Sequence, residues 1–599
     1  MKNCYDYLWK MKLLWIFFLL ILTGVVQSQV IPTERLTNWS NAGMPNLDTA
    51  NYQEISAFDL GIVGDGVTDN SGLLNSFLSN MNAKKKIIFF PTGSYLFGST
   101  LYPNDSIIFR GENADSTLFQ FNLSGMGNAI HVSGTKDNQA HLLLEDATAF
   151  QNYIRIENAF DFQPNSWIEL AQDDAQWITS SWALGSICQY AQISHIAGDT
   201  LFLLSELRNT YSLSNNAKVF KIQPKTHIGF ECIGMERLDN TAPQQTSTLF
   251  FNYANTCWMN GIALNKCTFS HIELSHSSQI SVTNSYVHHA HEYGDGGRGY
   301  GVALHFGTGE CLIENNVFEH LRHSILLQAG ANGNVITYNY SHDPFWSSTS
   351  PFIPSNSAGE LVLHGNYVYR NLFEMNSVQN IVIDNSHGPN GPYNTFLRNR
   401  ASLFGLFFSA DNSPSQNFIG NEIPNTSFPY SSVNYMLLGT DHFLYGNNNK
   451  GTIDPIGTED ISLMSLAYTN TPAFLNGQTL GQMGAPNTMG SYQTPAEFRT
   501  TNNQPLAGSC NQQLVLGKLE LNTSLITTFP NPFSDLLQIE SANYIQRINV
   551  YNSSGQLILV KKNIGTRFSL PGHELKSGYY HLQIETQFGC SFVRVIKID

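Results

Sequence analysis

The chain has 599 residues, of which 42% are hydrophobic and 13% are charged. This length exceeds that of one compact globule, so several modules or a solenoid are expected. The formal net charge is −15, and because the field of such a chain repels phosphate groups, the composition argues against a general nucleic-acid binder.

The first residues have the order of a secretory signal peptide. Lys10 and Lys12 precede an apolar run over residues 13–26, and short polar residues follow around Ser28. The run is shorter than the roughly 20 residues that cross a bilayer, and no other stretch comes close to that length. We therefore expect a removable signal peptide over residues 1–28 and no transmembrane segment once it is removed.

Without the cysteine of the signal peptide, an odd number of cysteines remains, and none form a CxxC pair. This pattern indicates neither a zinc ribbon nor a dense disulfide framework. Most of these cysteines are expected to be small hydrophobic residues of the core.

Residues 58–118 carry the first specific motifs. The Gly/Asp-rich stretch GDGVTDN at residues 64–70 precedes an expected helix from Ser71 to Met81, and a buried strand then ends in FPTGSY at residues 90–95. These motifs resemble the GDGxTD and FPxGxY motifs that open β-helices of the pectate lyase superfamily. The resemblance implies the fold, but lyases, glycoside hydrolases and phage tailspikes share it, so it does not imply one reaction.

A short strand followed by asparagine recurs between about residues 250 and 425. The asparagines are Asn284, Asn316, Asn339, Asn371, Asn399 and Asn421, with spacings of 32, 23, 32, 28 and 22 residues. A turn of a parallel β-helix has about that length, and stacked asparagines satisfy the backbone at the bend. The alternative is an antiparallel sandwich, which does not explain the asparagine spacing. We therefore predict an all-β fold with a right-handed parallel β-helix over residues 29–520.

The repeat is interrupted between about residues 150 and 225. Strands expected at 167–170 and 200–204 are connected through a hairpin-type turn at Gly198-Asp199. This pattern predicts a β-rich insertion that either walls a substrate cleft or caps one turn of the helix.

The composition changes again at about residue 520. PNPF at 530–533, NVYNSSGQ at 549–556 and LKSGYY at 575–580 alternate strands with turns, which predicts a small antiparallel β-sandwich over residues 521–599. Together with the basic end at Arg594 and Lys597, these motifs resemble the C-terminal sorting domain of the type IX secretion system. The resemblance implies that the secretion machinery is a partner and that the chain is exported through the periplasm and outer membrane, to be secreted or held at the cell surface. A carbohydrate-binding sandwich is the alternative.

Histidines gather in the middle of the predicted helix, where 11 of the 18 lie between His271 and His387. With the repeats aligned on asparagine, one column contains His288, His320 and Asp343, and the column before it contains Val287, Glu319, His342 and Glu374. Equivalent residues on successive turns lie about 4.8 Å apart. These columns are therefore expected to bring imidazoles and carboxylates within one sugar unit of each other.

Polar loops accompany the columns. Residues 288–301 are too polar and glycine-rich for a strand, and loops on a rigid scaffold often carry function. The candidate substrate-binding residues are Arg298, His288, His291, His323, Trp346, Glu374 and His387. Trp346 would stack on a sugar ring. For any one histidine, the alternative is a hydrogen-bonded structural role.

Two reactions fit these side chains. β-Elimination on a uronate needs a base, a group that neutralises the developing charge, and an acid; the candidates are His320 or His342, then Arg322 or Arg298, then Tyr293. Hydrolysis needs two carboxylates, for which the candidates are Glu319, Asp343 and Glu374. Histidine and arginine outnumber well-placed carboxylate pairs, so a lyase is favoured over a hydrolase. A non-catalytic glycan-binding surface protein is the third possibility.

Charge leaves the reaction open. Residues 271–400 contain five arginines, no lysine and ten acidic residues, a balance that disfavours an unscreened polyanion. A Ca²⁺ ion held by carboxylates of neighbouring turns would reverse it locally. The ordered NxD, DD and GHG pattern of polygalacturonases is missing, as is the lysine and arginine motif of calcium-dependent pectate lyases. The resemblance therefore implies the fold and a polysaccharide substrate, without its identity.

Overall fold

The computed structural model describes residues 31–47, 49–81, 85–239, 245–294, 296–347, 354–432, 434–508, 526–552, 557–586 and 589–598. The expected signal peptide, residues 1–28, lies outside these ranges. Within them, no helix is both long and apolar enough to cross a membrane.

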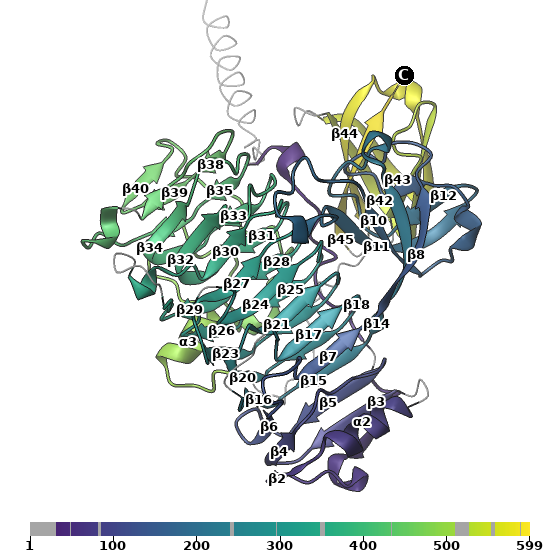
Figure 1. Ribbon diagram of the computed structural model, residues 1–599. Coiled ribbons are helices and arrows are strands. Elements are labelled where there is room, and N and C mark those ends of the chain that lie inside the picture. Colours follow the sequence, from purple (N-terminus) through teal and green to yellow (C-terminus); the bar gives the residue numbers. More distant parts are fainter. Residues whose placement is uncertain are drawn as a thin grey trace, which may run out of the picture.

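The main body is a right-handed parallel β-helix, whose turns follow one another from the purple lower end to the green upper end of Figure 1. A typical turn places one strand in the first sheet and then one in each of two further arrays. The first sheet contains β1 (Gln53–Ser56), β3 (Lys86–Phe90), β5 (Ile107–Gly111), β15 (Ile228–Glu231), β19 (Trp258–Asn260), β22 (Ser281–Thr283), β25 (Leu312–Glu314), β28 (Val335–Thr337), β31 (Leu372–Glu374), β33 (Thr395–Leu397), β35 (Asn417–Ile419) and β38 (Phe443–Tyr445). The predicted fold class is confirmed.

The other two arrays belong to one long sheet and share the strands β32 (Ser377–Asp384) and β34 (Arg400–Phe408). The second array contains β2 (Asp65–Asp69), β4 (Gly93–Phe97), β6 (Thr117–Phe121), β16 (Gly234–Arg237), β20 (Ala263–Cys267), β23 (Tyr286–Ala290), β26 (Val317–Glu319), β29 (Tyr340–His342), β36 (Glu422–Ile423) and β39 (Asn447–Asn449), with β40 (Thr452–Asp454) antiparallel to β39. The third array contains β7 (Ile130–Ser133), β17 (Leu249–Asn252), β21 (Ser270–Ser275), β24 (Tyr300–His305), β27 (His323–Leu327), β30 (Leu361–His364) and β37 (Tyr435–Met436). A short parallel pair, β14 (Lys225–Thr226) and β18 (Ala254–Asn255), lies at one turn.

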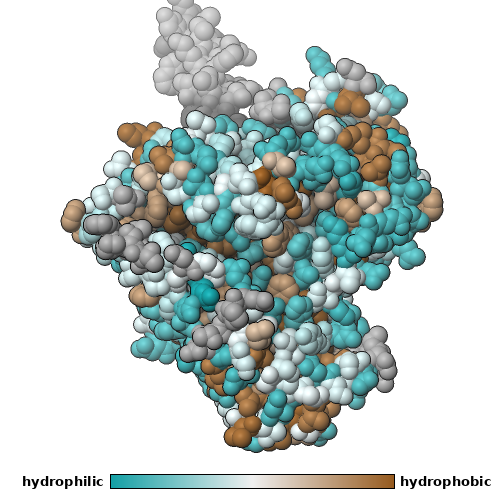
Figure 2. Space-filling view, in the orientation of Figure 1, coloured by the Kyte–Doolittle hydropathy of each residue, from teal (hydrophilic) through white to brown (hydrophobic). Residues whose placement is uncertain are grey.

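Alternate side chains of each strand fill the interior of the helix, as the two-residue period of a strand requires. Phe373 and Phe396 stack there on successive turns with ring centroids 4.7 Å apart. The helix α2 (Ser71–Ser79) buries Leu74 and Leu78 in the same core, and hydrophobic residues are also exposed at this lower end of the molecule (Figure 2). Among the described cysteines, Cys188, Cys257, Cys267 and Cys311 are buried free thiols.

Two ladders of amide side chains run along the first sheet, one just before its strands begin and one just after they end. The first contains Asn316, Asn339, Asn376, Asn399, Asn421 and Asn447, in which each Nδ2 donates to the next Oδ1 at 2.9–3.1 Å. The second contains Asn334, Asn371, Asn394 and Gln416. The prediction that asparagines stack on successive turns is confirmed, although Asn371 belongs to the second ladder and Ser285, not Asn284, occupies the equivalent position of the first.

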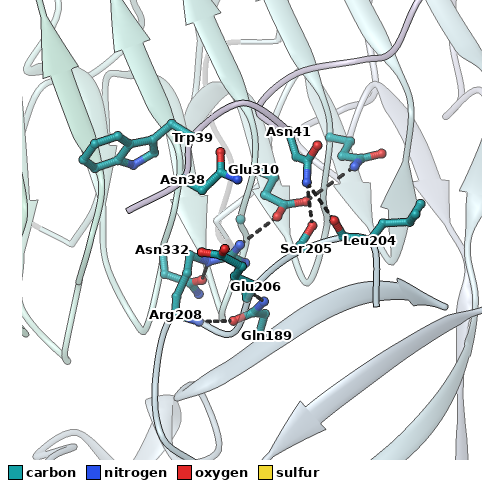
Figure 3. Close-up of polar contacts among 12 residues, drawn as sticks. Asn38, Trp39, Asn41, Gln189, Leu204, Ser205, Glu206, Arg208, Glu310 and Asn332 are labelled. Carbon is teal, nitrogen blue, oxygen red and sulfur yellow. Dashed lines mark hydrogen bonds and ion pairs between the residues drawn. The ribbon is translucent and has the colours of Figure 1, made fainter. Parts of the chain in front are cut away.

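The insertion is a six-stranded antiparallel sheet between β7 and β14. Its strands are β8 (Thr135–Leu142), β9 (Tyr153–Arg155), β10 (Trp167–Ala171), β11 (Cys188–Ala197), β12 (Thr200–Leu203) and β13 (Lys218–Gln223), so it begins before residue 150. Arg208 attaches it to the helix by donating to Glu310 at 2.8 Å and to Asn332 at 2.5 Å, and all three side chains are buried (Figure 3). A buried ion pair of this kind is costly to break, because the remaining charge loses its partner.

Two segments of the described chain that contain no strand cover the outer face of the first sheet. Residues 31–47 place Ile31 and Trp39 against it. Residues 458–508, here called the strap, run back along the same face, where Arg398 donates to the carbonyl oxygens of Ile461, Leu463, Met483 and Ala485. The strap includes α3 (Pro495–Thr501), which packs against β26 and β29. The strap therefore covers part of the first sheet and, through α3, part of the second array.

Short 3-10 helices connect these elements: η1 (Thr33–Arg35), η2 (Ala57–Leu60), η3 (Ala159–Asp161), η4 (Ser181–Ala183), η5 (Leu213–Asn215), η6 (Ser355–Ser357), η7 (Tyr430–Ser432), η8 (Ala473–Leu475) and η9 (Gly572–Glu574). The C-terminal segment is a five-stranded antiparallel sheet of β41 (Ile526–Phe529), β42 (Leu536–Asn552), β43 (Leu557–Pro571), β44 (Gly578–Thr586) and β45 (Gly589–Lys597), with a core of its own. The predicted antiparallel β domain is thus present at this end of the chain.

Candidate functional site

The structure brings together parts of the predicted columns, but at the first of these turns the register differs from the sequence alignment by one residue. His288, Glu319 and His342 are paired neighbours on β23, β26 and β29. The next position on each turn has a left-handed backbone and is occupied by His289, His320 and Asp343, with φ of 54°, 49° and 56°. Alignment on Asn284 caused the shift, because Ser285 is the residue equivalent to Asn316.

Val287 and Glu374 are not members of these columns. Val287 is fully buried in the helix core. Glu374 lies on β31 of the first sheet, where the strap covers it and where it accepts hydrogen bonds from the backbone N–H groups of Leu466 at 2.8 Å and Ala467 at 3.1 Å. The predicted grouping of Glu374 with Glu319 and His342 is corrected on this ground: the three do not share one face.

A histidine–carboxylate pair occupies the corner between the second and third arrays. His320 Nδ1 lies 2.7 Å from Asp343 Oδ2, and the two side chains are 24% and 60% exposed. Because the carboxylate accepts the Nδ1 proton, Nε2 is the ring nitrogen that carries the lone pair. The arrangement is that of a histidine base oriented by a carboxylate.

Aromatic rings hold the imidazole of His320 in place. It stacks between the rings of His289 and Phe345, with centroids 4.9 and 4.8 Å away. Tyr293 meets it edge-on at 5.0 Å. The Tyr293 hydroxyl oxygen accepts a hydrogen bond from the Ala290 N–H at 2.8 Å, and burial raises the pKa of Tyr293. The phenol therefore stays protonated near neutral pH, and its proton is not used in that bond.

The adjacent column is more buried and mostly neutral. Tyr286 stacks on His288 at 4.1 Å and donates its hydroxyl proton to Glu319. Burial lowers the pKa of His288 to about 3. It also lowers the pKa of His342, against the opposing charges of Glu319 and Asp343. These imidazoles are uncharged near neutral pH, and their lowered pKa values make them weaker bases than a solvent-exposed histidine.

Most of the predicted loop residues make contacts within the protein that keep the loops in place. Arg322 donates to the carbonyl oxygen of Gly294, and its guanidinium lies over the rings of Tyr300 at 5.8 Å and Trp346 at 5.2 Å. His291 contacts the Arg237 carbonyl at 2.9 Å. His323 is buried beside the Gly359 carbonyl at 2.7 Å.

Arg298 differs from these residues. It pairs with Glu292 at 3.0 Å and keeps 28% of its side chain exposed. The exposed part of its side chain is where a bound acidic group could reach it.

His387 belongs to a second group of polar residues, at the end of the third array. There His364 Nδ1 lies 2.5 Å from Asp384 Oδ2, and His387 meets His364 edge-on at 4.8 Å. Burial opposes ionisation of Asp384, but hydrogen bonds from His364, Ser386 and Ser409 outweigh it and lower the pKa of that carboxyl. The His364–Asp384 pair was missed because its two members belong to different turns, 20 residues apart, and the asparagines that follow them, Asn366 and Asn385, stand at different spacings from them.

The described ranges contain no group of three or more His, Cys, Asp or Glu side chains that could hold a metal ion. The Ca²⁺ ion considered from the charge balance therefore has no such set of ligands in this part of the chain.

Comparison with known proteins adds two family matches. Residues 55–165 match the family described as rhamnogalacturonase A/epimerase, pectate lyase-like. Residues 527–598 match the secretion system C-terminal sorting domain. Both resemblances seen in the sequence are thus confirmed, and the sorting domain indicates export to the cell surface or secretion. No curated protein matches the chain.

Similar solved structures include two phage tailspikes and an epimerase. Tailspike gp61 of Pseudomonas phage phi297 is 9% identical over 91% of this chain and 96% of that chain, with a TM-score of 0.48. Tailspike gp49 of Pseudomonas phage LKA1 is 13% identical over 66% and 75%, with a TM-score of 0.44. The A-module of the mannuronan C-5 epimerase AlgE4 from Azotobacter vinelandii is 10% identical over 67% and 93%, with a TM-score of 0.31.

Proposed function

We propose that this exported β-helix protein is a polysaccharide lyase that cleaves a uronate-containing glycan by β-elimination at the His320 corner. The observation that carries the proposal is the 2.7 Å contact between His320 Nδ1 and Asp343 Oδ2 on a partly exposed surface. The pectate lyase-like match of residues 55–165 supports a polysaccharide substrate. The proposal keeps the roles expected from the sequence for His320 and Tyr293, and adds one for Asp343.

In the proposed reaction, His320 Nε2 removes the proton on the carbon next to the uronate carboxyl group. Asp343 keeps the ring in the required tautomer and stabilises the imidazolium that forms. As the double bond forms, the bond to the neighbouring glycosidic oxygen breaks. Tyr293 gives its proton to that oxygen and regains one from His320 through solvent. Arg298 is the proposed partner of the uronate carboxylate, because part of its side chain is exposed.

Hydrolysis by Glu319 and Asp343 is the second candidate, because the negative charges of both carboxylates raise the pKa of the same imidazole, that of His342. Two carboxyl groups on either side of a glycosidic bond are the usual equipment of a glycoside hydrolase. Glu319 already accepts a hydrogen bond from the Tyr286 hydroxyl, which makes hydrolysis the weaker of the two assignments. A glycan-binding protein without turnover is the remaining alternative.

The test incubates the secreted protein with a panel of uronate-containing and neutral polysaccharides. We expect unsaturated products that absorb in the ultraviolet, and we expect His320→Ala to lower their rate of formation by about 100-fold or more. His195→Ala, which changes an exposed histidine of the insertion, is the matched control. New reducing ends without ultraviolet absorbance would mark hydrolysis. Full activity of a folded His320→Ala variant would overturn the assignment.

A further inference from the structure

The insertion presents an exposed tryptophan, Trp182, at its junction with the β-helix. Trp182 lies on η4 and is 46% exposed. Its ring meets the ring of Phe306 edge-on at 6.0 Å and that of His387 at 5.4 Å. Phe306 and His387 both belong to the helix, so this aromatic group is made by two parts of the chain that are far apart in sequence.

The backbone around Trp182 is fixed to the helix. Ala183 is fully buried in a small apolar cluster with Ile178, Ile187 and Ala329. The Thr179 hydroxyl donates to the His387 carbonyl at 3.1 Å. An exposed ring on a segment held in this way is preorganised, so a ligand that packs on it loses little freedom of the protein.

Hydrogen-bonding groups lie next to the exposed ring. His387, which contacts Trp182, also contacts His364, and His364 is paired with Asp384. Asp384 further accepts hydrogen bonds from the hydroxyls of Ser386 and Ser409, both on the outer side of the third array. An aromatic face with a few convergent polar groups is the usual composition of a site for a small polar ligand.

The carboxylate of this group is already bound by its neighbours. The carboxylate of Asp384 is paired with His364. Burial lowers the pKa of His387, and it lowers the pKa of the neighbouring His305 to about 3. These two rings are therefore neutral near neutral pH. A neutral sugar ring suits such a surface, because its apolar face can pack on an indole while its hydroxyls bond to imidazole and carboxylate.

We propose that Trp182, Phe306, His364, Asp384 and His387 form a second glycan-binding site, for a neutral pyranose. This site, here called the Trp182 site, is separate from the reacting corner at His320. It holds a sugar residue without taking part in bond cleavage, and it does not depend on whether the corner at His320 is a lyase, a hydrolase or inactive.

The test measures binding of neutral gluco-, galacto-, manno- and rhamno-oligosaccharides to the full-length secreted protein by titration calorimetry. At least one of these sugars is expected to bind, and Trp182→Ala is expected to weaken its binding at least tenfold. Phe160→Ala is the matched control, since Phe160 is an 81% exposed aromatic residue of the same insertion. His320→Ala should bind like the wild type, which separates this site from the proposed reaction.

A second variant distinguishes loss of the binding site from a folding defect of Trp182→Ala. His387→Ala removes a ring of the site without changing η4, and it is expected to weaken binding in the same direction. Failure of the wild-type protein to bind any of the neutral oligosaccharides would overturn the proposal. Unchanged binding in both folded variants would also overturn it.

Discussion

One hydrogen bond determines what the second nitrogen of an imidazole can do. At His320, Asp343 occupies Nδ1, while the rings of His289 and Phe345 hold the plane of the imidazole. The ring cannot turn without losing all three contacts, so Nε2 stays directed to one place. Because Asp343 is 60% exposed, this pair contributes more to orientation than to stability.

Asp343→Asn is predicted to separate two effects of Asp343, its orientation of the His320 ring and its negative charge. Asparagine keeps the size of the side chain but cannot stabilise an imidazolium ion, so kcat for the proposed elimination should fall about 100-fold while KM changes little. The melting temperature should stay that of the wild type. Asp137→Asn, an exposed aspartate of the insertion, is the control. If Asp343→Asn retained full activity while His320→Ala lost it, the carboxylate would have no part in the reaction.

At the scale of the element, the amide ladders set the spacing of the turns. Asn376 shows how: its Nδ2 donates to the Ile336 carbonyl at 2.8 Å and to Asn399 at 2.9 Å, while its Oδ1 accepts from the Asn339 N–H at 3.1 Å. Every one of these groups is buried. A single residue therefore satisfies polar groups of three successive turns.

Asn376→Ala is predicted to lower the free energy of unfolding by about 2–4 kcal/mol, because it leaves several buried polar groups without partners. Denaturant unfolding followed by circular dichroism would measure the change. Asn470→Ala, at an exposed asparagine of the strap, should change stability by less than about 0.5 kcal/mol. Equal effects of the two substitutions would contradict the structural role of the ladder.

The ladder also explains how far the sequence predicts the site. The strand–asparagine repeat was sufficient for the fold and for the neighbourhood of His320 and Asp343. It failed at Asn376, because residues between β29 and β30 lengthen that turn to 37 residues, and the alignment chose Asn371 instead. Asn371 is also a ladder residue, so the pattern alone could not separate the two corners of a turn.

At the scale of the whole molecule, buried carboxyl groups link stability to pH. Burial raises the pKa of Glu273 and Glu314 to about 7 and that of Glu360 to about 8. The folded chain therefore holds these protons at pH values where the unfolded chain, with a usual value of 4.5, has released them. The stability that these protonated carboxyl groups contribute to the folded state is fully present below about pH 4.5 and is lost as the pH rises toward 8.

Glu360→Gln is predicted to reduce this dependence. The amide resembles the protonated acid and can still accept from the backbone N–H of Asn380, which donates to Glu360 at 2.8 Å. The melting temperature of the variant, relative to that of the wild type, should therefore rise between pH 5 and pH 8. Glu157→Gln, at an exposed position of the insertion, should show no such trend. A constant difference across this range would mean that Glu360 is ionised throughout.

The strap could not be foreseen from local patterns. Residues 458–508, all within the described ranges, contain no strand, and their place is determined by contacts with turns up to about 200 residues earlier, such as the bond from Arg499 to the Asn315 carbonyl. Glu374, which the sequence alignment placed among the candidate site residues, holds the strap in place through contacts of the same kind. Long-range burial of this kind leaves no short-range signal.

The strap has a consequence for how the chain folds. Leu312, Val335, Leu372 and Leu397 form an apolar stripe on the first sheet, and Ile461 and Ala485 of the strap help to cover it. During synthesis, the strands that carry the stripe emerge before the residues that shield it. A truncated chain that stopped before residue 458 would leave much of this stripe in contact with water, as a surface prone to aggregation.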